Sequence, residues 1–273
     1  MLKIPGYTTS GLLPNRSHGN IFLGTRNSDS LQIAIKCVER DELPNTRNDQ
    51  GRLFHEVQML ILLEHSNIVK LYDYGVTKSV IFLVTEYLAK GDLKNFLHFN
   101  QVKYDPIIYL IQLVTALNYI HERGILHLDL NPTNIGLRED GSLCLFDFGI
   151  SIERDNIKLR SKPGTVIGTP SYLAPEQIAL LQCYDERTDI YSLGCVFYEI
   201  FTGKKLFNDL TIEEVLKTKL INSDDKFIDV QSPFDNFLQL CIAKNPDDRF
   251  ENCKQILNWI DEFYPQYNGK INH

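Results

Sequence analysis

Hydrophobic and polar positions follow a strand-like pattern in the first third of the chain, with one helical interruption. Short runs rich in strand-forming residues at 21–23, 31–35, 68–74 and 80–84 are bounded by turn-forming residues, which predicts β-strands. Within 53–61, apolar residues recur every three or four positions, which predicts a helix with one apolar face. The first third is therefore expected to be a small sheet with one helix.

The remaining two thirds of the chain carry helical patterns. A long apolar helix is expected to begin at Tyr104-Asp105-Pro106 and to end at Gly124. Further helices are expected at about 175–182, 187–202, 211–221, 233–243 and 252–263. This arrangement predicts an α+β protein with two unequal lobes, residues 1–86 and residues 87–273.

The amino-acid composition limits the kinds of partner that we expect this protein to bind. Of the 273 residues, 43% are hydrophobic, enough for a core, and the net charge of −7 is the opposite of a nucleic-acid-binding footprint. The six cysteines are scattered without a CxxC pair, the first residues lack an apolar signal core, and the apolar runs are too short to cross a bilayer. We expect a cytoplasmic protein with no nucleic-acid partner and no membrane partner.

The stretch from His127 to Gly149 holds the first candidate chemistry. Asp129, Asn134 and Asp147 lie around a strand–turn–strand pattern, and a hairpin there would bring their side chains to one edge. Three oxygen-bearing groups in one place suit a hard divalent cation with a base beside it. Any one of them alone is better explained as a turn-forming residue, so their joint spacing has to be interpreted together with the rest of the chain.

Six segments in chain order are similar to motifs of one family. They are IAIK (33–36), HLDLNPTN (127–134), DFG (147–149), GTPSYLAPE (168–176), DIYSLG (189–194) and NPDDRF (245–250). The chain resembles the protein kinases of the Ser/Thr branch over about residues 12–262, in style nearest to bacterial-type members. The resemblance implies a bilobal protein-kinase-like fold, with a small antiparallel β lobe carrying one long helix and a larger, mainly helical lobe. It also implies transfer of the ATP γ-phosphate to Ser or Thr hydroxyls of a protein substrate, with Mg²⁺, or Mn²⁺, as the metal.

The resemblance assigns the central roles residue by residue. Lys36 would hold the α- and β-phosphates and form an ion pair with Glu56, although each alone would be interpreted as a solvated charge. Asp147 and Asn134 would bind the metal ions. Asp129 would orient the substrate hydroxyl and accept its proton.

The resemblance also places the nucleotide. The adenine would lie at the hinge residues Glu86 to Leu88, with Ala34 above it and Asp92 near the ribose. The glycine-rich loop would add Arg16, Gly19 and Ile21.

Structural roles carry over in the same way. Glu176 and Arg249 would form a buried ion pair, Asp189 would anchor the catalytic loop, and His127 would have a packing role.

The chain departs from the family pattern at four positions. Pro14 and Arg16 replace glycines of the phosphate loop, Asn131 replaces a lysine that neutralises the transferring phosphoryl group, and Leu128 replaces an arginine that pairs with a phosphorylated activation loop. We expect an active but slow kinase that does not depend on activation-loop phosphorylation, with Arg16 supplying the charge that Asn131 lacks. The alternatives are a pseudokinase that acts through partner binding and a small-molecule kinase on the same fold.

Overall fold

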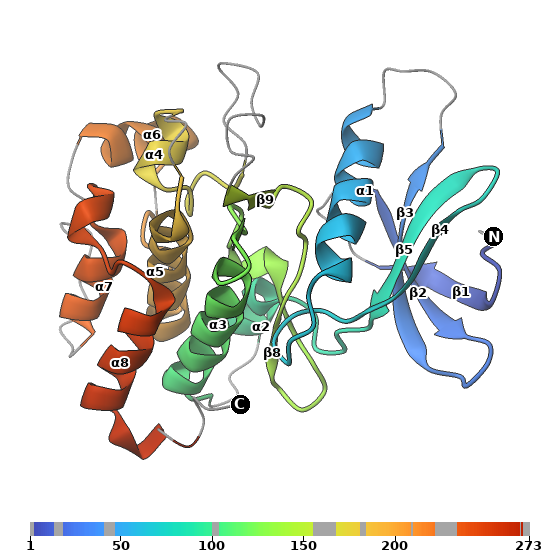
Figure 1. The fold of residues 1–273 in the computed structure, drawn as a ribbon, viewed down its shortest axis with the longest axis horizontal. Helices are drawn as coiled ribbons and strands as arrows, with labels where there is room; N and C mark the ends of the chain where they lie inside the picture. Colours follow the sequence, from blue (N-terminus) through green and yellow to red (C-terminus); the bar gives the residue numbers. More distant parts are fainter. Residues whose placement is uncertain are drawn as a thin grey trace. The chain divides into compact units, whose positions relative to one another are not determined.

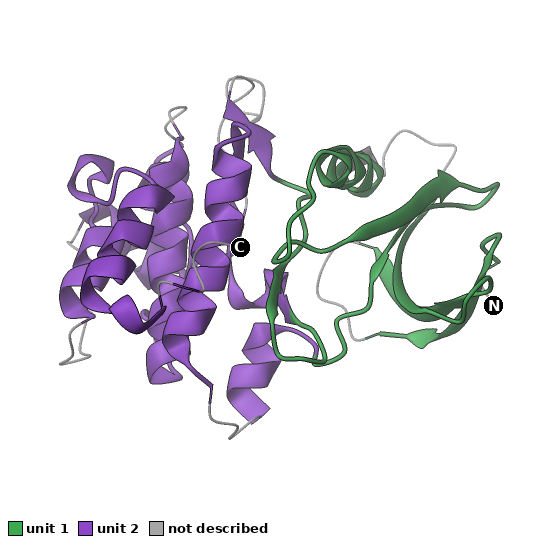
Figure 2. Ribbon diagram, turned by 60° about the horizontal axis from the view of Figure 1, so that its bottom comes forward, with its two compact units in different colours: residues 1–90, 137–150 green, residues 91–136, 151–273 purple. Residues whose placement is uncertain are grey.

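The computed structural model describes residues 3–13, 19–40, 47–99, 104–154, 168–180, 184–208, 210–221, 234–267 and 269. The chain forms two compact units, shown in different colours in Figure 2. Unit 1 comprises residues 1–90 and 137–150, and unit 2 comprises residues 91–136 and 151–273. An antiparallel sheet dominates the first unit and helices dominate the second, which confirms the predicted α+β class.

Unit 1 is built on a five-stranded antiparallel sheet with the order β1-β2-β3-β5-β4. The strands are β1 (Tyr7–Leu12), β2 (Asn20–Arg26), β3 (Gln32–Glu39), β4 (Leu71–Val76) and β5 (Val80–Glu86). The alternation along β3 buries Ile33, Ile35 and Cys37 in the core of this unit, because successive side chains of a strand point to opposite faces.

One long helix covers a face of this sheet. Helix α1 (Arg47–Ile61) packs on β3, β4 and β5 (Figure 1). Its apolar face buries Leu53, Val57 and Leu60, as the helical periodicity predicted. Phe54 and Ile61, which the same periodicity placed on that face, are exposed. The helix begins at Arg47, before the start of the apolar pattern. Its first turns are polar, so apolar periodicity could not predict them.

A short hairpin explains why unit 1 contains residues far along the chain. Strands β7 (Ile135–Leu137) and β8 (Leu143–Leu145) form the predicted strand–turn–strand. In unit 1, the Lys90 amide donates to the Leu137 carbonyl at 3.1 Å, and the Arg138 guanidinium binds the Glu86 carboxylate at 2.6 and 2.7 Å. The predicted division after residue 86 follows chain order alone and therefore places this hairpin in the second lobe. The predicted domain assignment stays a prediction.

Unit 2 is a helical assembly. Its longer helices are α2 (Leu93–Phe99), α3 (Pro106–His121), α5 (Glu186–Thr202), α6 (Ile212–Ile221), α7 (Asp235–Ile242) and α8 (Cys253–Phe263). Helix α3 packs on α5 and α8, and α5 packs on α7 (Figure 1). This unit also contains the one-turn helix α4 (Pro175–Ile178) and the strand pair β6 (Ile125–Leu126) and β9 (Ile152–Glu153).

The ends of α3 match their sequence signals. The Asp105 side chain accepts a hydrogen bond from the Ile107 amide at 3.0 Å, Pro106 occupies the first turn, and Gly124 takes the left-handed conformation just beyond the helix.

No helix in the described part of the chain is long and apolar enough to cross a membrane.

One strand starts later than the alternation predicted. Strand β4 begins at Leu71 instead of Ile68. Ile68 instead forms an isolated parallel bridge with Leu145, and the Lys70 amide donates to the Glu86 carboxylate at 2.9 Å. Tertiary partners of the backbone therefore override the local pattern here.

Candidate active site

A buried charge network lies in unit 1 where β3, α1 and the end of the hairpin meet. The Lys36 Nζ atom lies 2.7 Å from Glu56 Oε2 and 3.3 Å from Asp147 Oδ1. The Lys36 and Glu56 side chains are 12% and 6% exposed, so neither is a solvated charge. The structure therefore forms the ion pair that the resemblance implied and adds Asp147 to it.

Burial and mutual attraction set the protonation of this network. Burial alone would lower the pKa of Lys36, but the charges of Glu56 and Asp147 outweigh that effect and raise it. Burial raises the pKa of Glu56 to about 7, against the lowering effect of Lys36. Lys36 is therefore a permanent cation at neutral pH, which a phosphate-binding residue requires.

The backbone at Asp147 is held in an uncommon conformation. Asp147 has φ of +63°, a left-handed value that costs a residue other than glycine of order 1 kcal/mol or more. Gly149 follows closely, and a Cβ atom there would lie 3.2 Å from Asp147 Oδ1. The DFG segment thus places the Asp147 carboxylate beside Lys36 and leaves little room at the third position.

The second cluster lies in unit 2, at the start of the 3₁₀ helix η2 (Pro132–Asn134). Asp129 Oδ2 accepts a hydrogen bond from Asn134 Nδ2 at 2.9 Å. Asp129 Oδ1 accepts from the Thr169 amide at 3.1 Å and from the Thr169 hydroxyl at 3.2 Å. An aliphatic hydroxyl therefore donates to the carboxylate predicted to act as the base.

Asn131 has its polar atoms occupied inside the loop. Its Nδ2 donates to the Asp129 carbonyl at 3.0 Å and to the Thr169 hydroxyl at 3.1 Å, and its Oδ1 accepts from the Thr133 amide at 2.9 Å. A primary amide has two N–H groups, and both are used. Asn131 therefore fixes the loop, as the N-cap of η2, and has no donor left for a phosphate.

Asn134 has an oxygen that suits a metal ion. It is 5% exposed, its Nδ2 donates to Asp129, and no donor to its Oδ1 exists in the part of the chain that the structure describes. A buried amide oxygen without a donor is costly unless a ligand occupies it. The described residues contain no group of three His, Cys, Asp or Glu that could hold a metal. Mg²⁺ needs no such group, because it is bound through one or two carboxylates, phosphates and water. The amide oxygen of Asn134 in unit 2 and the carboxylate of Asp147 in unit 1 are each of a type that Mg²⁺ accepts.

Asp189 anchors the backbone on the N-terminal side of Asp129. Its carboxylate accepts from the His127 and Leu128 amides, both at 2.8 Å, and lies 2.9 Å from His121 Nε2. Burial would raise the pKa of Asp189, but His121 and these amides lower it. Burial would likewise lower the pKa of His121, but Cys253 and Asp189 outweigh it and raise that pKa to about 9. The predicted anchoring role of Asp189 is confirmed, and His121 is its unpredicted partner.

Leu128 has an apolar environment. It is 1% exposed and packs with Leu126 and Ile152, and Tyr184 covers this cluster. Ile152 belongs to β9, the strand that follows the DFG segment. Apolar packing therefore occupies the position where the resemblance implied an arginine for a phosphate.

The predicted adenine-binding hinge holds an unpredicted ion pair. The Glu86 carboxylate is bound by Arg138 and by the Lys70 amide, and these bonds lower its pKa against the effect of burial. The Glu86 carboxylate is thus bound by Arg138, and the Glu86 amide donates to the Lys70 carbonyl at 3.0 Å, so the predicted adenine contact at the hinge stays a prediction. Ala34 lies on the neighbouring strand, paired with Thr85.

The other predicted nucleotide contacts fall in both units. Asp92 in unit 2 caps α2, accepting from the Asn95 amide at 2.7 Å and from Asn95 Nδ2 at 2.8 Å. In unit 1, Ile21 pairs with Lys36 across β2 and β3, and Gly19 has φ of +92°. Leu88 is half-buried at the hinge. Pro14 and Arg16 lie outside the described residues, so their predicted roles stay predictions.

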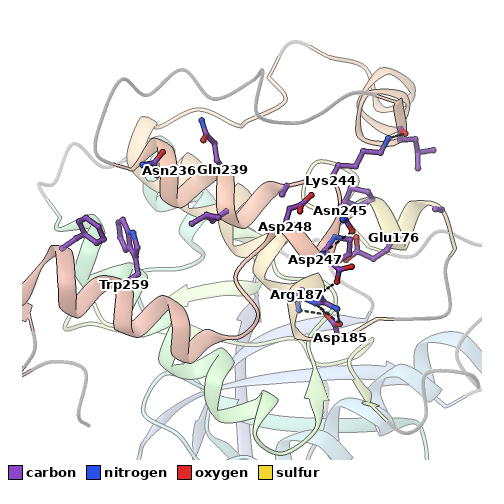
Figure 3. A pocket seen from close by; sticks show the side chains of 17 residues that line it. Glu176, Asp185, Arg187, Asn236, Gln239, Lys244, Asn245, Asp247, Asp248 and Trp259 are labelled. Atoms are coloured by element: carbon purple, nitrogen blue, oxygen red, sulfur yellow. Dashed lines mark hydrogen bonds and ion pairs between the residues drawn. The ribbon is translucent and has the colours of Figure 1, made fainter.

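The predicted ion pair of unit 2 is also present. The Arg249 side chain has no exposed surface, and its two terminal nitrogens lie 2.8 and 2.9 Å from the two Glu176 oxygens. Beside this pair lies a groove of about 1270 Å³ between α4, α7 and α8. Figure 3 shows Arg187 between Asp185 and Asp247 at one end of the groove and Trp259 at the other. The groove is larger than a typical small-molecule site.

Known proteins resemble the chain over most of its length. The protein kinase domain family matches residues 7–259. An Aurora kinase of Eremothecium gossypii is 30% identical over 97% of this chain and 71% of its own length. The serine/threonine-protein kinase ULK3 of Xenopus laevis is 32% identical over 90% of this chain and 53% of its own length, and a probable serine/threonine-protein kinase of Clostridium acetobutylicum is 33% identical over 86% and 36%. The chain therefore spans about half, or less, of several relatives, and these come from both eukaryotes and bacteria.

Proposed function

Because the chain belongs to the protein kinase family, we propose that it is an ATP-dependent serine/threonine kinase that phosphorylates a protein substrate. The observation that carries this proposal is the pair of hydrogen bonds from the Thr169 amide and hydroxyl to Asp129 Oδ1. They hold the Asp129 carboxylate and show that it accepts the hydrogen bond of an aliphatic alcohol. A Ser or Thr acceptor needs this geometry to lose its proton.

The proposed reaction uses residues of both units. Asp129 orients the acceptor hydroxyl, whose oxygen forms a bond to the γ-phosphorus of ATP as the bond to the β–γ bridging oxygen breaks. The hydroxyl proton passes to Asp129, and ADP leaves. Lys36, fixed by Glu56, binds the α- and β-phosphates, and Asn134 with Asp147 would hold Mg²⁺, or Mn²⁺, which neutralises phosphate charge when bound.

We propose that turnover is slow, since Asn131 offers no positive charge and no unused donor to the transferring group. The loss of one well-placed donor at a developing charge reduces the rate by about 10²–10³ in other enzymes. A cytoplasmic location is part of the proposal, because none of the cysteines in the described residues forms a disulfide.

A pseudokinase is the second candidate, and the internal hydrogen bonds of Asn131 favour it. Radiolabelled transfer from Mg-ATP to a general protein acceptor, compared between the wild type and Asp129→Asn, separates the two. A kinase transfers label in the wild type and loses at least about 10²-fold in the variant, whereas a pseudokinase shows no dependence on Asp129. A thermal-shift titration with Mg-ATP, run on both proteins, checks that each still folds and reports whether nucleotide binds.

A further inference from the structure

A lysine lies fully buried in unit 2, away from the proposed phosphate-binding residues. Lys219 on α6 has no exposed surface. Its Nζ atom donates to the Ser171 carbonyl at 2.9 Å and to the Leu173 carbonyl at 2.7 Å. The ammonium group therefore connects α6 to a segment 46 to 48 residues earlier in the chain.

Two aromatic rings also lie against this ammonium. Nζ lies 4.7 Å from the centre of the Tyr191 ring and 4.6 Å from the centre of the Phe207 ring, within cation–π range. Burying a charge is costly even when it is compensated, and an apolar residue of similar volume is often as stable or more stable. A core lysine is thus a poor choice for stability alone, which suggests a use for the two carbonyl contacts.

The segment that Lys219 holds begins at the proposed base. Thr169 donates to Asp129 through its amide and hydroxyl, and its carbonyl accepts from the Tyr172 and Leu173 amides at 2.9 and 3.2 Å. Ser171 follows Thr169 by two residues, so their Cα atoms lie no more than about 7 Å apart. A polypeptide whose hydroxyl reaches Asp129 must run close to this turn, because the turn starts at the same carboxylate.

The exposure of the turn fits such a contact. Residues 168–171 are half-buried, whereas residues 172–174 are buried. The accessible side is therefore supported from within by the carbonyl contacts of Lys219.

We propose that Lys219 is a positioning residue that fixes the turn at residues 169–173 as the surface that receives the polypeptide acceptor. This inference rests on the proposed kinase function. Lys219 then determines how well the protein substrate binds, while nucleotide binding at Lys36 and Asp147 does not depend on it.

Steady-state kinetics of Lys219→Met test the proposal. The variant keeps most of the length of the side chain and loses both carbonyl contacts, so we expect KM for the protein acceptor to rise at least about 10-fold. KM for ATP and the transfer of phosphate to water should stay within about twofold, because neither uses the acceptor surface. Lys219→Arg, which restores a charged donor, should recover part of the acceptor affinity.

Lys217 provides a matched control on the same helix. Its side chain is 67% exposed and lies 3.3 Å from Glu213, so Lys217→Met should change none of these constants. Thermal unfolding of each variant verifies that the protein folds. Equal changes in both KM values, or an unchanged acceptor KM in folded Lys219→Met, would overturn the proposal.

Hydrogen exchange distinguishes a failure of the proposed role of Lys219 from a failure of the proposed kinase function. The amides of Tyr172 and Leu173 should exchange at least about 10-fold faster in Lys219→Met if Lys219 holds the turn, and unchanged exchange rejects that role. Absence of Asp129-dependent transfer in the wild type would reject the kinase function, and the acceptor role with it. Transfer in the wild type with an unchanged acceptor KM in Lys219→Met rejects the acceptor role alone.

Discussion

Replacing Arg249 by methionine should destabilise unit 2 by several kcal/mol. All five N–H groups of the guanidinium have partners: two bind Glu176, and the others bind the carbonyls of Ala243, Arg187 and Lys244 at 2.7, 2.8 and 3.1 Å. Methionine keeps most of the apolar stem but leaves the Glu176 carboxylate, 4% exposed, without its cation. Breaking a buried ion pair in this way costs about 3–5 kcal/mol, which corresponds to a decrease in Tm of roughly 10 °C for a chain of this size.

Urea unfolding followed by tryptophan fluorescence measures this cost where it arises. Trp259 is the only tryptophan of the chain and lies on α8, so its signal reports on unit 2. Lys254→Met is the control on the same helix, because Lys254 forms an exposed pair with Glu122, with side chains 67% and 47% exposed, and should lose less than about 1 kcal/mol.

A second substitution separates the buried charge from lost packing. Adding Glu176→Gln to Arg249→Met removes the unpaired carboxylate, so the double variant should regain at least about 1 kcal/mol relative to Arg249→Met. A loss below about 1 kcal/mol in the single variant, or a double variant less stable than the single one, would refute the reasoning.

Two further predictions concern pH and phosphorylation. His121 has a pKa of about 9 in the folded protein against 6.5 for the free side chain. Its contribution of up to about 3 kcal/mol should therefore be complete below pH 6.5 and lost as the pH rises through 9. Tm measured across this range should fall more steeply in the wild type than in His121→Gln, and parallel curves would contradict the assignment. Since Leu128 packs in an apolar cluster, alanine at the hydroxyl-bearing positions of the activation segment should leave the phosphotransfer rate within a few-fold, and a complete loss would count against this. The positions replaced together are Ser161, Thr165 and Ser171, and Thr169 is kept because it binds Asp129.

Apolar periodicity predicted most elements of the fold because burial of one face determines them. The patterns expected at 187–202 and 252–263 became α5 at Glu186–Thr202 and α8 at Cys253–Phe263. The start of β4 could not be predicted in this way, because the backbone of Ile68 and Lys70 binds the distant residues Leu145 and Glu86.

The candidate active site could likewise be predicted only in part from the sequence. The motifs identified Lys36 and Asp129, but gave no signal for Arg138, whose partners are assembled only by the fold. Lys219 did have a signal: it follows the buried Val215 by four residues, on the face of α6 where periodicity predicts an apolar side chain. From the sequence alone, a lysine at such a position is interpreted as solvated. Its burial could not be predicted, because the carbonyls and rings that it contacts lie far away in the chain.

The contacts of the segment at 168–176 are consistent with the proposed activity in a chain that has no arginine at position 128. One end is held by Thr169 on Asp129 and Asn131, the middle by Lys219, and the other end by Arg249 on Glu176. The buried Tyr172 hydroxyl also donates to Glu199. None of these contacts requires a phosphate, so we expect a charge added by phosphorylation to add little to the hold on residues 168–176. The same contacts use both N–H groups of Asn131, which connects the hold on this segment to the slow turnover that we propose.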